Sequence, residues 1–145
     1  MAAPFGGRIF LADTSAWTRS DAPTVAPSWR KALSARQIVT CPIVTLELLR
    51  SARDGAEFDT KSETLDMLRD IAITRSVTNA ALAAYRALAH RHPLFHRSVK
   101  LPDLLIAAAA ADAGIGVLHY DADFDTLATV LPFESRWIAR PGSLP

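Results

Sequence analysis

Short apolar runs alternate with segments of helical periodicity along this chain. Four runs predict buried strands, because each is brief, mostly apolar and bounded by turn or capping residues: 8–12, 37–41, 116–120 and 135–139. The segments between them are compatible with helices: 28–35, 42–53, 57–71, 78–90, 104–113 and 124–130. This alternation is typical of a mostly parallel sheet covered on both faces. The pattern therefore predicts an α/β fold, a three-layer α/β/α sandwich.

Helical spacing also predicts how two of the helices pack. Each carries one apolar stripe, made of Leu65, Leu68 and Ile71 in segment 57–71 and of Leu82, Tyr85, Leu88 and Ala89 in segment 78–90. The two stripes predict an antiparallel helical pair. Elsewhere, Pro42 suits the first turn of a helix, and Gly114 suits a left-handed cap at the end of the alanine-rich helix.

Length and composition limit these expectations. With 145 residues, 50% of them hydrophobic and 21% charged, the chain is expected to form one domain over residues 1–145 with a substantial core. Lys+Arg 16 against Asp+Glu 15 leave a formal net charge of +1. Bulk charge therefore does not indicate a nucleic-acid binder, and any such surface has to be local.

The cysteine content and the longest apolar stretch concern the cellular compartment. Cys41 is the one cysteine, so no internal disulfide can form, and no charged segment followed by an apolar one opens the sequence. The most apolar stretch runs from Leu104 to Ala111, about eight residues against the roughly 20 that a membrane-spanning helix needs. We therefore expect a cytoplasmic protein with no membrane partner.

Two carboxylates directly follow predicted strands. Asp13 comes after strand 8–12, and Asp121 comes after strand 116–120. Ligands of parallel sheets collect at the carboxyl ends of strands, so both side chains are candidates for a shared site. Capping of the next helix is an equal alternative for Asp13. The neighbouring Ser15 hydroxyl could hold a metal-bound water, contact the Asp13 carboxylate or cap the helix locally.

Two further acids lie in helical segments. Glu47 projects between Ile43 and Val44 one turn earlier, so the predicted helix places a carboxylate on its core-facing stripe. A buried carboxylate without a partner is costly, which calls for a cation or for an ion pair with Arg50. Asp103 stands at the start of the alanine-rich helix, where complementing the helix dipole is the alternative to binding a ligand.

Asp123 and Asp125 continue an alternating acidic run that begins at Asp121. A calcium-binding loop is not expected, because the central glycine and terminal glutamate of the EF-hand pattern are missing. One or two of the three acids are candidates for a metal cluster, and Asp125 is expected to be a solvated acid at a helix start. Taken together, the separated acids predict a pocket for a hard divalent cation, since such ions prefer carboxylate oxygens.

Four segments, in this order, resemble the motifs of the PIN-domain nucleases, in particular the VapC-type toxins of toxin-antitoxin pairs. They are FLADTSAW (10–17), TLELLR (45–50), LPDLLIAAAA (101–110) and VLHYDADFD (117–125). The resemblance implies a compact α/β/α domain with a metal-dependent endoribonuclease site. It implies that the catalytic acids, which bind Mg²⁺ or Mn²⁺, are Asp13, Glu47, Asp103 and Asp121, with Asp123 as a candidate fifth ligand. It also implies an RNA substrate, a homodimer and a small VapB-like antitoxin that blocks the groove.

The densest basic stretch of the chain leads directly to Asp103. Arg91, Arg97 and Lys100, interleaved with histidines, are candidates to contact RNA phosphates, and an ordinary solvated connection is the alternative. The histidines do not predict a zinc site, because no cysteine pairs with them and their spacing fits no common zinc finger.

Two other classes of protein compete with a nuclease. A receiver-like signalling domain also groups acids at strand ends around Mg²⁺, but it needs a lysine near the last strands, and no lysine follows Lys100. An inactive PIN-fold binding module would keep the fold without the chemistry, and intact acids at all four places argue against it. Metal-dependent cleavage of RNA by the purified protein would separate an enzyme from a binding module.

Overall fold

The centre of the structure is a parallel sheet of four strands. This computed structural model describes residues 4–145; residues 1–3, which the expected domain includes, lie outside the described part. The strands are β1 (Phe10–Ala12), β2 (Ile38–Val39), β3 (Gly116–His119) and β4 (Ser135–Trp137), in the spatial order β2-β1-β3-β4. Leu11 of β1 pairs with Val39 on one side and with Val117 on the other.

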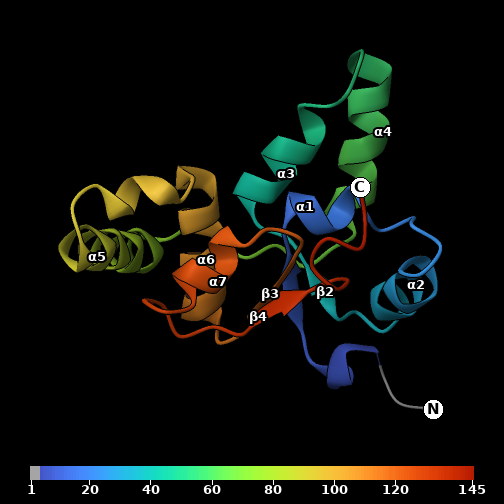
Figure 1. Ribbon diagram of the computed structural model, residues 1–145. Coiled ribbons are helices and arrows are strands. Elements are labelled where there is room, and N and C mark those ends of the chain that lie inside the picture. Colours follow the sequence, from blue (N-terminus) through green and yellow to red (C-terminus); the bar gives the residue numbers. More distant parts are fainter. Residues whose placement is uncertain (1–3) are drawn as a thin grey trace.

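Helices connect the strands and cover both faces of the sheet (Figure 1). They are α1 (Thr14–Trp17), α2 (Ala26–Ser34), α3 (Pro42–Leu49), α4 (Gly55–Asp66), α5 (Arg75–Arg91), α6 (Leu101–Ala113) and α7 (Asp123–Leu127). Two 3-10 turns, η1 (Pro4–Gly7) and η2 (Phe95–Ser98), complete the described part of the chain. The expected fold class, an α/β sandwich with a parallel sheet, is confirmed.

The strands direct alternate side chains into two separate cores. Leu11 and Val117 belong to a core shared with α3, α5, α6 and α7, whereas Phe10 and Leu118 belong to a core shared with α1 and α2. All four side chains are 0% exposed. Because both faces of the sheet are buried, the strands appear in the sequence as nearly continuous apolar runs.

Helix α6 is the central helix of the larger core. Its alanines 107–110 are completely buried, and their small side chains let the helix lie close to the sheet and to α5. The helix ends at Gly114, whose φ of 70° is the left-handed conformation that glycine adopts without strain. The predicted cap is therefore confirmed.

The expected antiparallel pair of helices 57–71 and 78–90 is wrong. Helix α4 packs against α3, and α5 packs against α6, so the two helices lie on different parts of the molecule (Figure 1). The buried face of α5 is formed by Val77, Ala81, Ala84 and Leu88, and Tyr85 packs against the same core, while Leu82 is 69% exposed. Of the predicted stripe, Leu82 therefore lies on the wrong face of this helix.

Helix α4 also ends earlier than its apolar spacing predicted. Its last residue is Asp66, so Leu68 and Ile71 lie beyond it. The chain there runs along the edge of the sheet, where Asp70 forms a parallel bridge with Thr40 next to β2. A sheet partner thus replaces the final helical turn.

The carboxyl ends of β1 and β3 are adjacent in the middle of the sheet. Helix α1 starts directly after β1 and contacts both β3 and α3, while α6 contacts α3 and α7. The starts of α1, α6 and α7 therefore lie together beside α3 at the carboxyl end of the sheet. In the part of the chain that the structure describes, no helix is long and apolar enough to span a bilayer.

Candidate metal centre

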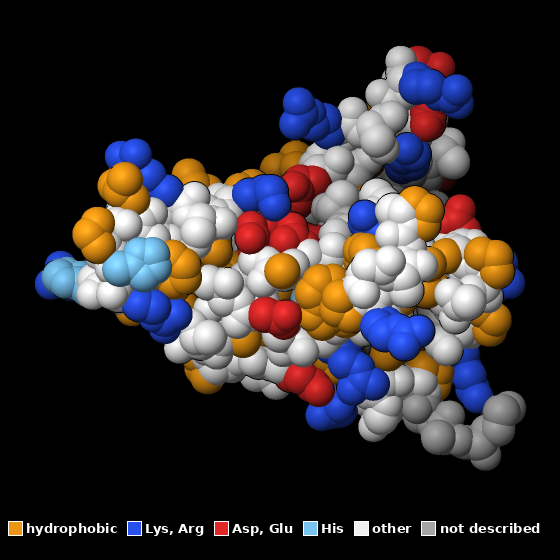
Figure 2. Space-filling view, viewed as in Figure 1, with side chains coloured by type: hydrophobic (Ala, Val, Ile, Leu, Met, Phe, Trp, Pro, Cys, Tyr) orange, Lys and Arg blue, Asp and Glu red, His pale blue; other side chains and the backbone are white. Residues whose placement is uncertain are grey.

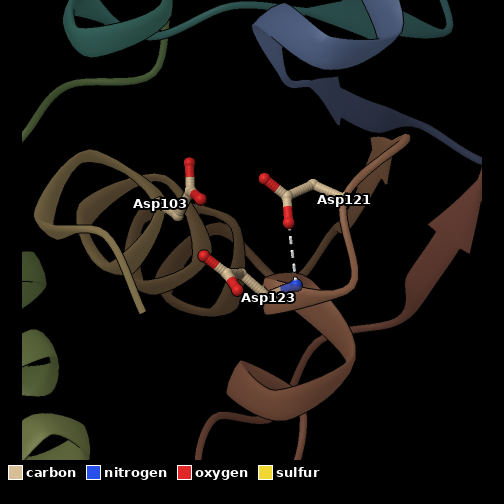
Figure 3. A group of neighbouring side chains, drawn as sticks. All are labelled: Asp103, Asp121 and Asp123. Atoms are coloured by element: carbon tan, nitrogen blue, oxygen red, sulfur yellow. Dashed lines mark hydrogen bonds between the residues drawn. The ribbon is translucent and has the colours of Figure 1, made fainter. Parts of the chain in front are cut away.

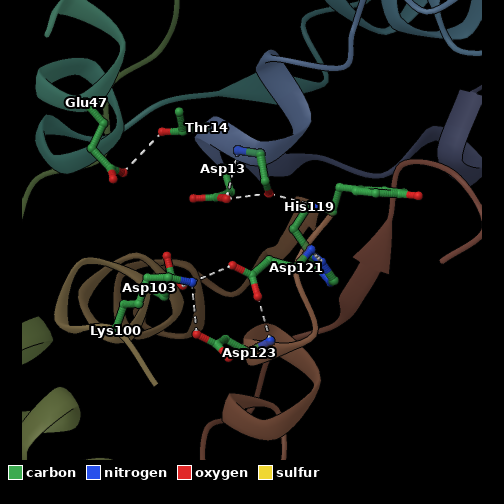
Figure 4. A network of polar contacts seen from close by, with 10 residues as sticks. Asp13, Thr14, Glu47, Lys100, Asp103, His119, Asp121 and Asp123 are labelled. Carbon is green, nitrogen blue, oxygen red and sulfur yellow. Dashed lines mark hydrogen bonds and ion pairs between the residues drawn. The ribbon is translucent and has the colours of Figure 1, made fainter. Parts of the chain in front are cut away.

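Five carboxylates from four segments of the chain meet at this carboxyl end of the sheet (Figure 4). Asp13 follows β1, Glu47 lies on α3, Asp103 lies in the first turn of α6, Asp121 follows β3, and Asp123 begins α7. Asp13 and Asp103 are among the few buried polar residues of the protein, at 4% and 5% exposure. The fold thus brings together acids that are far apart in the sequence.

Asp103, Asp121 and Asp123 form the tightest group (Figure 3). Each offers a carboxylate oxygen, and these three oxygens lie within 4.8 Å of one another. The backbone N–H of Asp123 donates to Asp121 Oδ1 at 2.9 Å, which fixes the turn between β3 and α7. The three carboxylates therefore face a common point from two elements.

Asp103 does not cap its helix. The N-terminal capping position of α6 is Lys100, and no side chain caps the helix there. Asp103 Oδ2 is buried and has no hydrogen-bond partner. Burial, followed by the negative charges of Asp13 and Asp121, raises the pKa of Asp103 to about 7. This carboxylate needs a cation more than any other group in the cluster.

Asp13 both caps a helix and faces the cluster. Its Oδ2 accepts the backbone N–H of Ser15 at 3.0 Å and the Ser15 hydroxyl at 2.5 Å. Ser15 Oγ in turn accepts the backbone N–H of Tyr120 at 2.9 Å, so it ties the end of β1 to the end of β3. Burial raises the pKa of Asp13 despite these hydrogen bonds, and the charge of Asp121 raises it further. Of the roles considered for Ser15, the contact with the Asp13 carboxylate is the one the structure contains.

Glu47 is half-buried on α3 and faces the same carboxyl end of the sheet. Its Oε1 accepts a hydrogen bond from the Thr14 hydroxyl at 3.1 Å, so its partner is Thr14 and not Arg50, which is exposed. Burial raises the pKa of Glu47, and the charge of Asp13 adds to this effect. Thr14 was not singled out in the sequence, because a threonine at a helix start is usually a local cap.

Lys100 supplies the positive charge of the cluster. Its Nζ lies 3.0 Å from Asp121 Oδ2, 3.4 Å from Asp123 Oδ2 and 3.7 Å from Asp103 Oδ2. These carboxylates raise the pKa of the Lys100 ammonium. The side chain is 66% exposed and reaches in from the start of α6, as Figure 4 shows. A single ammonium thus occupies the position where three acids converge.

The donor set fits a hard divalent cation. All candidate ligands are carboxylate oxygens, which suit Mg²⁺ or Mn²⁺ better than the nitrogen and sulfur ligands preferred by zinc. Such an ion would bind the buried Asp103 Oδ2, which accepts no hydrogen bond, and would relieve the mutual repulsion of the acids. One lysine does not neutralise five carboxylates.

Arg91 and Arg97 lie apart from this cluster. Arg91 ends α5, donates to the Thr129 hydroxyl at 3.0 Å and lies 5.6 Å from the centre of the Phe95 ring; Arg97 is exposed on η2. Figure 2 shows histidine and basic side chains gathered at the left-hand end of the molecule, away from the central group of acids. Of the three basic candidates, the structure brings Lys100 to the acids.

Asp125 is exposed at the start of α7, as the sequence indicated, but it is not merely solvated. Its carboxylate accepts hydrogen bonds from the Ser135 hydroxyl and from Trp137 Nε1, at 2.6 and 2.9 Å. It therefore joins α7 to β4. The pairing of the two elements in space creates this contact, and neither segment alone signals it.

Comparison with known proteins identifies the family. The family model described as "PIN domain" matches residues 10–130. The chain belongs to the PIN-domain family. It is 42% identical to Ribonuclease VapC18 of Mycobacterium tuberculosis, a match covering 94% of this chain and 99% of that protein. It is 37% identical to Ribonuclease VapC51 of the same organism, covering 93% and 96%. Within the PIN-domain family, the chain therefore groups with the VapC ribonucleases.

Solved structures have the same fold. The VapBC complex of Salmonella typhimurium bound to DNA contains a chain that matches with a TM-score of 0.68 and 15% identity, covering 88% of this chain and 98% of that one. VapBC2 of Rickettsia felis bound to a promoter DNA fragment matches with a TM-score of 0.67 and 16% identity, over the same shares. At this identity the likeness concerns the fold, and it agrees with the parallel sheet described above.

Proposed function

We propose that this PIN-domain protein is a metal-dependent endoribonuclease and the toxin of a toxin-antitoxin pair. The observation that carries the proposal is the buried Asp103 carboxylate, whose Oδ2 has no hydrogen-bond partner and which faces Asp121 and Asp123. The relatives named VapC ribonucleases support the same activity. We take residues 1–145 to act as one PIN domain.

The proposed ligands of Mg²⁺ or Mn²⁺ are Asp103, Asp121 and Asp123, whose carboxylate oxygens lie within 4.8 Å of one another, with Asp13 and Glu47 as further candidates at the rim. When bound, such an ion supplies a more acidic water and stabilises charge on the phosphate. Asp103 is the ligand that gains most, because the cation would satisfy its buried oxygen and hold it ionised at neutral pH. Ser15, in α1, keeps the Asp13 carboxylate in place and is itself held by the backbone N–H of Tyr120 at the end of β3.

The remaining charged groups act on the RNA. Glu47, held at the rim by Thr14, is placed to accept a proton from the attacking water, and its raised pKa suits that task. The Lys100 side chain is long and mostly exposed, so an ion that displaces its ammonium leaves it within reach of the scissile phosphate. Arg91 and Arg97 are proposed to contact the RNA backbone farther along.

The proposed partners follow from the relatives. Solved structures with this fold include VapBC toxin-antitoxin complexes, which supports a small VapB-like antitoxin for this chain. We also propose a homodimer. An antitoxin that covers the cluster of carboxylates would exclude RNA and so restrain the toxin until the antitoxin is removed.

Cleavage of RNA by the purified protein tests the proposal. The matched pair of variants is Glu47→Gln, in the cluster, and Glu57→Gln, on α4, where Glu57 pairs with Arg53 and Lys61 on the surface. We expect wild type and Glu57→Gln to cleave RNA with Mg²⁺ or Mn²⁺ and to stop when EDTA is added. Glu47→Gln is expected to be slower by about 100-fold or more.

Growth measurements complete the test. Wild-type protein expressed without an antitoxin should arrest growth, whereas Glu47→Gln and Asp13→Asn should not. An inactive PIN-fold binding module would instead give no metal-dependent cleavage by any of these proteins. Equal cleavage by wild type and Glu47→Gln would also overturn the assignment.

A further inference from the structure

A chain of hydrogen bonds runs through His119 and connects the turn at Asp121–Asp123 with strand β4. The backbone N–H of Asp121 donates to His119 Nδ1 at 3.1 Å, and His119 Nε2 lies 2.7 Å from Ser135 Oγ. The Ser135 hydroxyl donates to Asp125 Oδ1 at 2.6 Å. The other oxygen of Asp125 accepts from Trp137 Nε1 at 2.9 Å.

The direction of every bond in this chain is determined. A backbone N–H can only donate, so His119 Nδ1 must be the acceptor nitrogen of a neutral ring. The single hydroxyl proton of Ser135 is given to Asp125, so Ser135 Oγ must accept from His119 Nε2–H. The chain thus selects one tautomer of His119.

Packing fixes the plane of the His119 ring. The side chain is 0% exposed and is held between two aromatic rings, with the Phe124 ring stacked at 5.0 Å between centroids and the Trp137 ring edge-on at 5.0 Å. A buried ring in this setting can neither rotate nor move without breaking both contacts. His119 Nδ1 is therefore presented to the Asp121 amide in a constant position.

The same residues do not form a second nucleophilic site. A serine nucleophile needs a base to take its proton, but the Ser135 proton is directed at Asp125 and its oxygen is an acceptor for His119. His119 Nδ1 faces a backbone amide and no carboxylate. The arrangement instead matches the outer hydrogen bonds that orient ligands of a metal site.

We propose that His119 is a positioning residue for the metal centre, in its neutral tautomer with the proton on Nε2. It holds the Asp121 amide, and this amide sets the turn in which the Asp123 N–H donates to Asp121 Oδ1. The turn places the Asp121 and Asp123 carboxylates opposite Asp103. Ser135 and Asp125 act through His119 by selecting the tautomer. This inference rests on the proposed function, since it concerns the same carboxylates.

Two substitutions test the roles of the two His119 ring nitrogens separately. Asparagine in His119→Asn can offer its Oδ1 to the N–H two residues later, as in an Asx turn, so it keeps the acceptor for Asp121. Glutamine in His119→Gln places its amide near the former Nε2 position and loses that acceptor. Calorimetric titration of the purified proteins with Mn²⁺ gives the affinity, and RNA cleavage gives kcat and KM separately.

We expect His119→Gln to bind Mn²⁺ about tenfold or more weakly than wild type, and His119→Asn to stay within about threefold. Ser135→Ala should weaken Mn²⁺ binding, and Ser135→Thr, which keeps the hydroxyl, should restore it. At low Mn²⁺ concentration, His119→Gln and Ser135→Ala should have a lower kcat than wild type. At high Mn²⁺ concentration kcat should recover, and KM for RNA should be unchanged throughout. A purely structural role would change thermal stability without this pattern.

The result that overturns the inference is equal Mn²⁺ affinity in wild type and His119→Gln. Equal weakening in His119→Asn and His119→Gln overturns it as well. If either His119 variant fails to fold, the Ser135 pair decides the question with the ring intact. Failure of the proposed function is a different result, because in that case wild type itself binds no Mn²⁺ or cleaves no RNA.

Discussion

The ammonium of Lys100 donates a hydrogen bond to Asp121 Oδ2 at 3.0 Å, between the starts of α6 and α7. Asp103 and Asp123 lie close to the same nitrogen. A divalent ion that binds these carboxylates has to displace the ammonium. Lys100 is therefore a tethered competitor of the metal as well as a proposed ligand of the RNA phosphate.

The variant Lys100→Met tests this competition. Without the ammonium, the metal-free protein should unfold at a lower temperature, because the acids lose their counter-charge. The shift in unfolding temperature on adding Mg²⁺ should become larger, since the ion no longer competes with a lysine. RNA cleavage should nevertheless fall. Thermal unfolding with and without Mg²⁺, together with a cleavage assay, measures all three effects.

Lys61→Met is the matched control. Lys61 pairs with Glu57 at 3.1 Å on the surface of α4, away from the acidic cluster. Surface pairs of this kind contribute little, so stability should change little and the Mg²⁺ shift should equal that of wild type. A Mg²⁺ shift in Lys100→Met that is no larger than the shift in the control would contradict the role given to Lys100.

The raised pKa of Asp103 predicts a pH-dependent stability of the metal-free protein. With its pKa moved from 3.8 to about 7, the folded state binds more protons than the unfolded state between these values. The contribution of Asp103 to stability is therefore fully present below about pH 4 and is lost as the pH rises to about 7. The difference in unfolding free energy between wild type and Asp103→Asn, measured in EDTA, isolates this term.

We expect the unfolding free energy of wild type to increase relative to that of Asp103→Asn as the pH falls from 7 to 4. His119 works in the opposite direction, because burial lowers its pKa to about 4, but it is present in both proteins. Asp112→Asn, at the far end of α6, is a control for the substitution itself, since Asp112 is exposed. A difference that is constant across this range would mean that Asp103 ionises normally.

The sequence predicted the fold and the approximate place of the acids for one physical reason. Parallel strands buried on both faces are apolar throughout, so the strands and the residues that follow them are visible as runs ending in Asp13 and Asp121. Glu47 was visible because a carboxylate on an apolar helical stripe is unusual. These signals are local, and each survives without knowledge of the other elements.

What the sequence did not reveal depends on how distant segments meet. The ammonium of Lys100 lies among three acids only because α6 and α7 start side by side. The hydrogen bonds through His119 require β3 and β4 to pair in a register that puts His119 beside Trp137. The helix packing error has the same origin, because the buried face of α5 is defined by its contact with α6 and its small side chains give a weak pattern.

Thr14→Val tests the support of Glu47. The valine has the shape of threonine but cannot donate to Glu47 Oε1. Loss of a hydrogen bond to a charged group costs about 1.5 kcal/mol, so kcat/KM for RNA should fall about tenfold. Thr14→Ser keeps the hydroxyl and should cleave almost as fast as wild type. Equal rates for the valine and serine variants would show that this hydrogen bond does not matter for catalysis.

Gly116→Ala tests the close contact of the two central strands. A Cβ at this position would lie 2.6 Å from a carbon of the Phe10 ring and 2.9 Å from the backbone oxygen of Glu134. Overpacking of this kind costs about 1–3 kcal/mol, which denaturant unfolding can measure. Gly55→Ala is the control, because nothing lies within 4 Å of its added Cβ, and stability there should be unchanged or slightly higher.

Metal binding at the acidic cluster can be observed through the anomalous scattering of Mn²⁺ in crystals of the purified protein grown or soaked with that ion. We expect a peak within bonding distance of Asp103 and Asp121, with Asp13 nearby and the Lys100 ammonium displaced from the three carboxylates. Crystals of Asp103→Asn under the same conditions should lack the peak or show it much weakened. A well-ordered site that shows no peak, with Lys100 still bound to Asp121 in the presence of Mn²⁺, would mean that these carboxylates do not form a metal site.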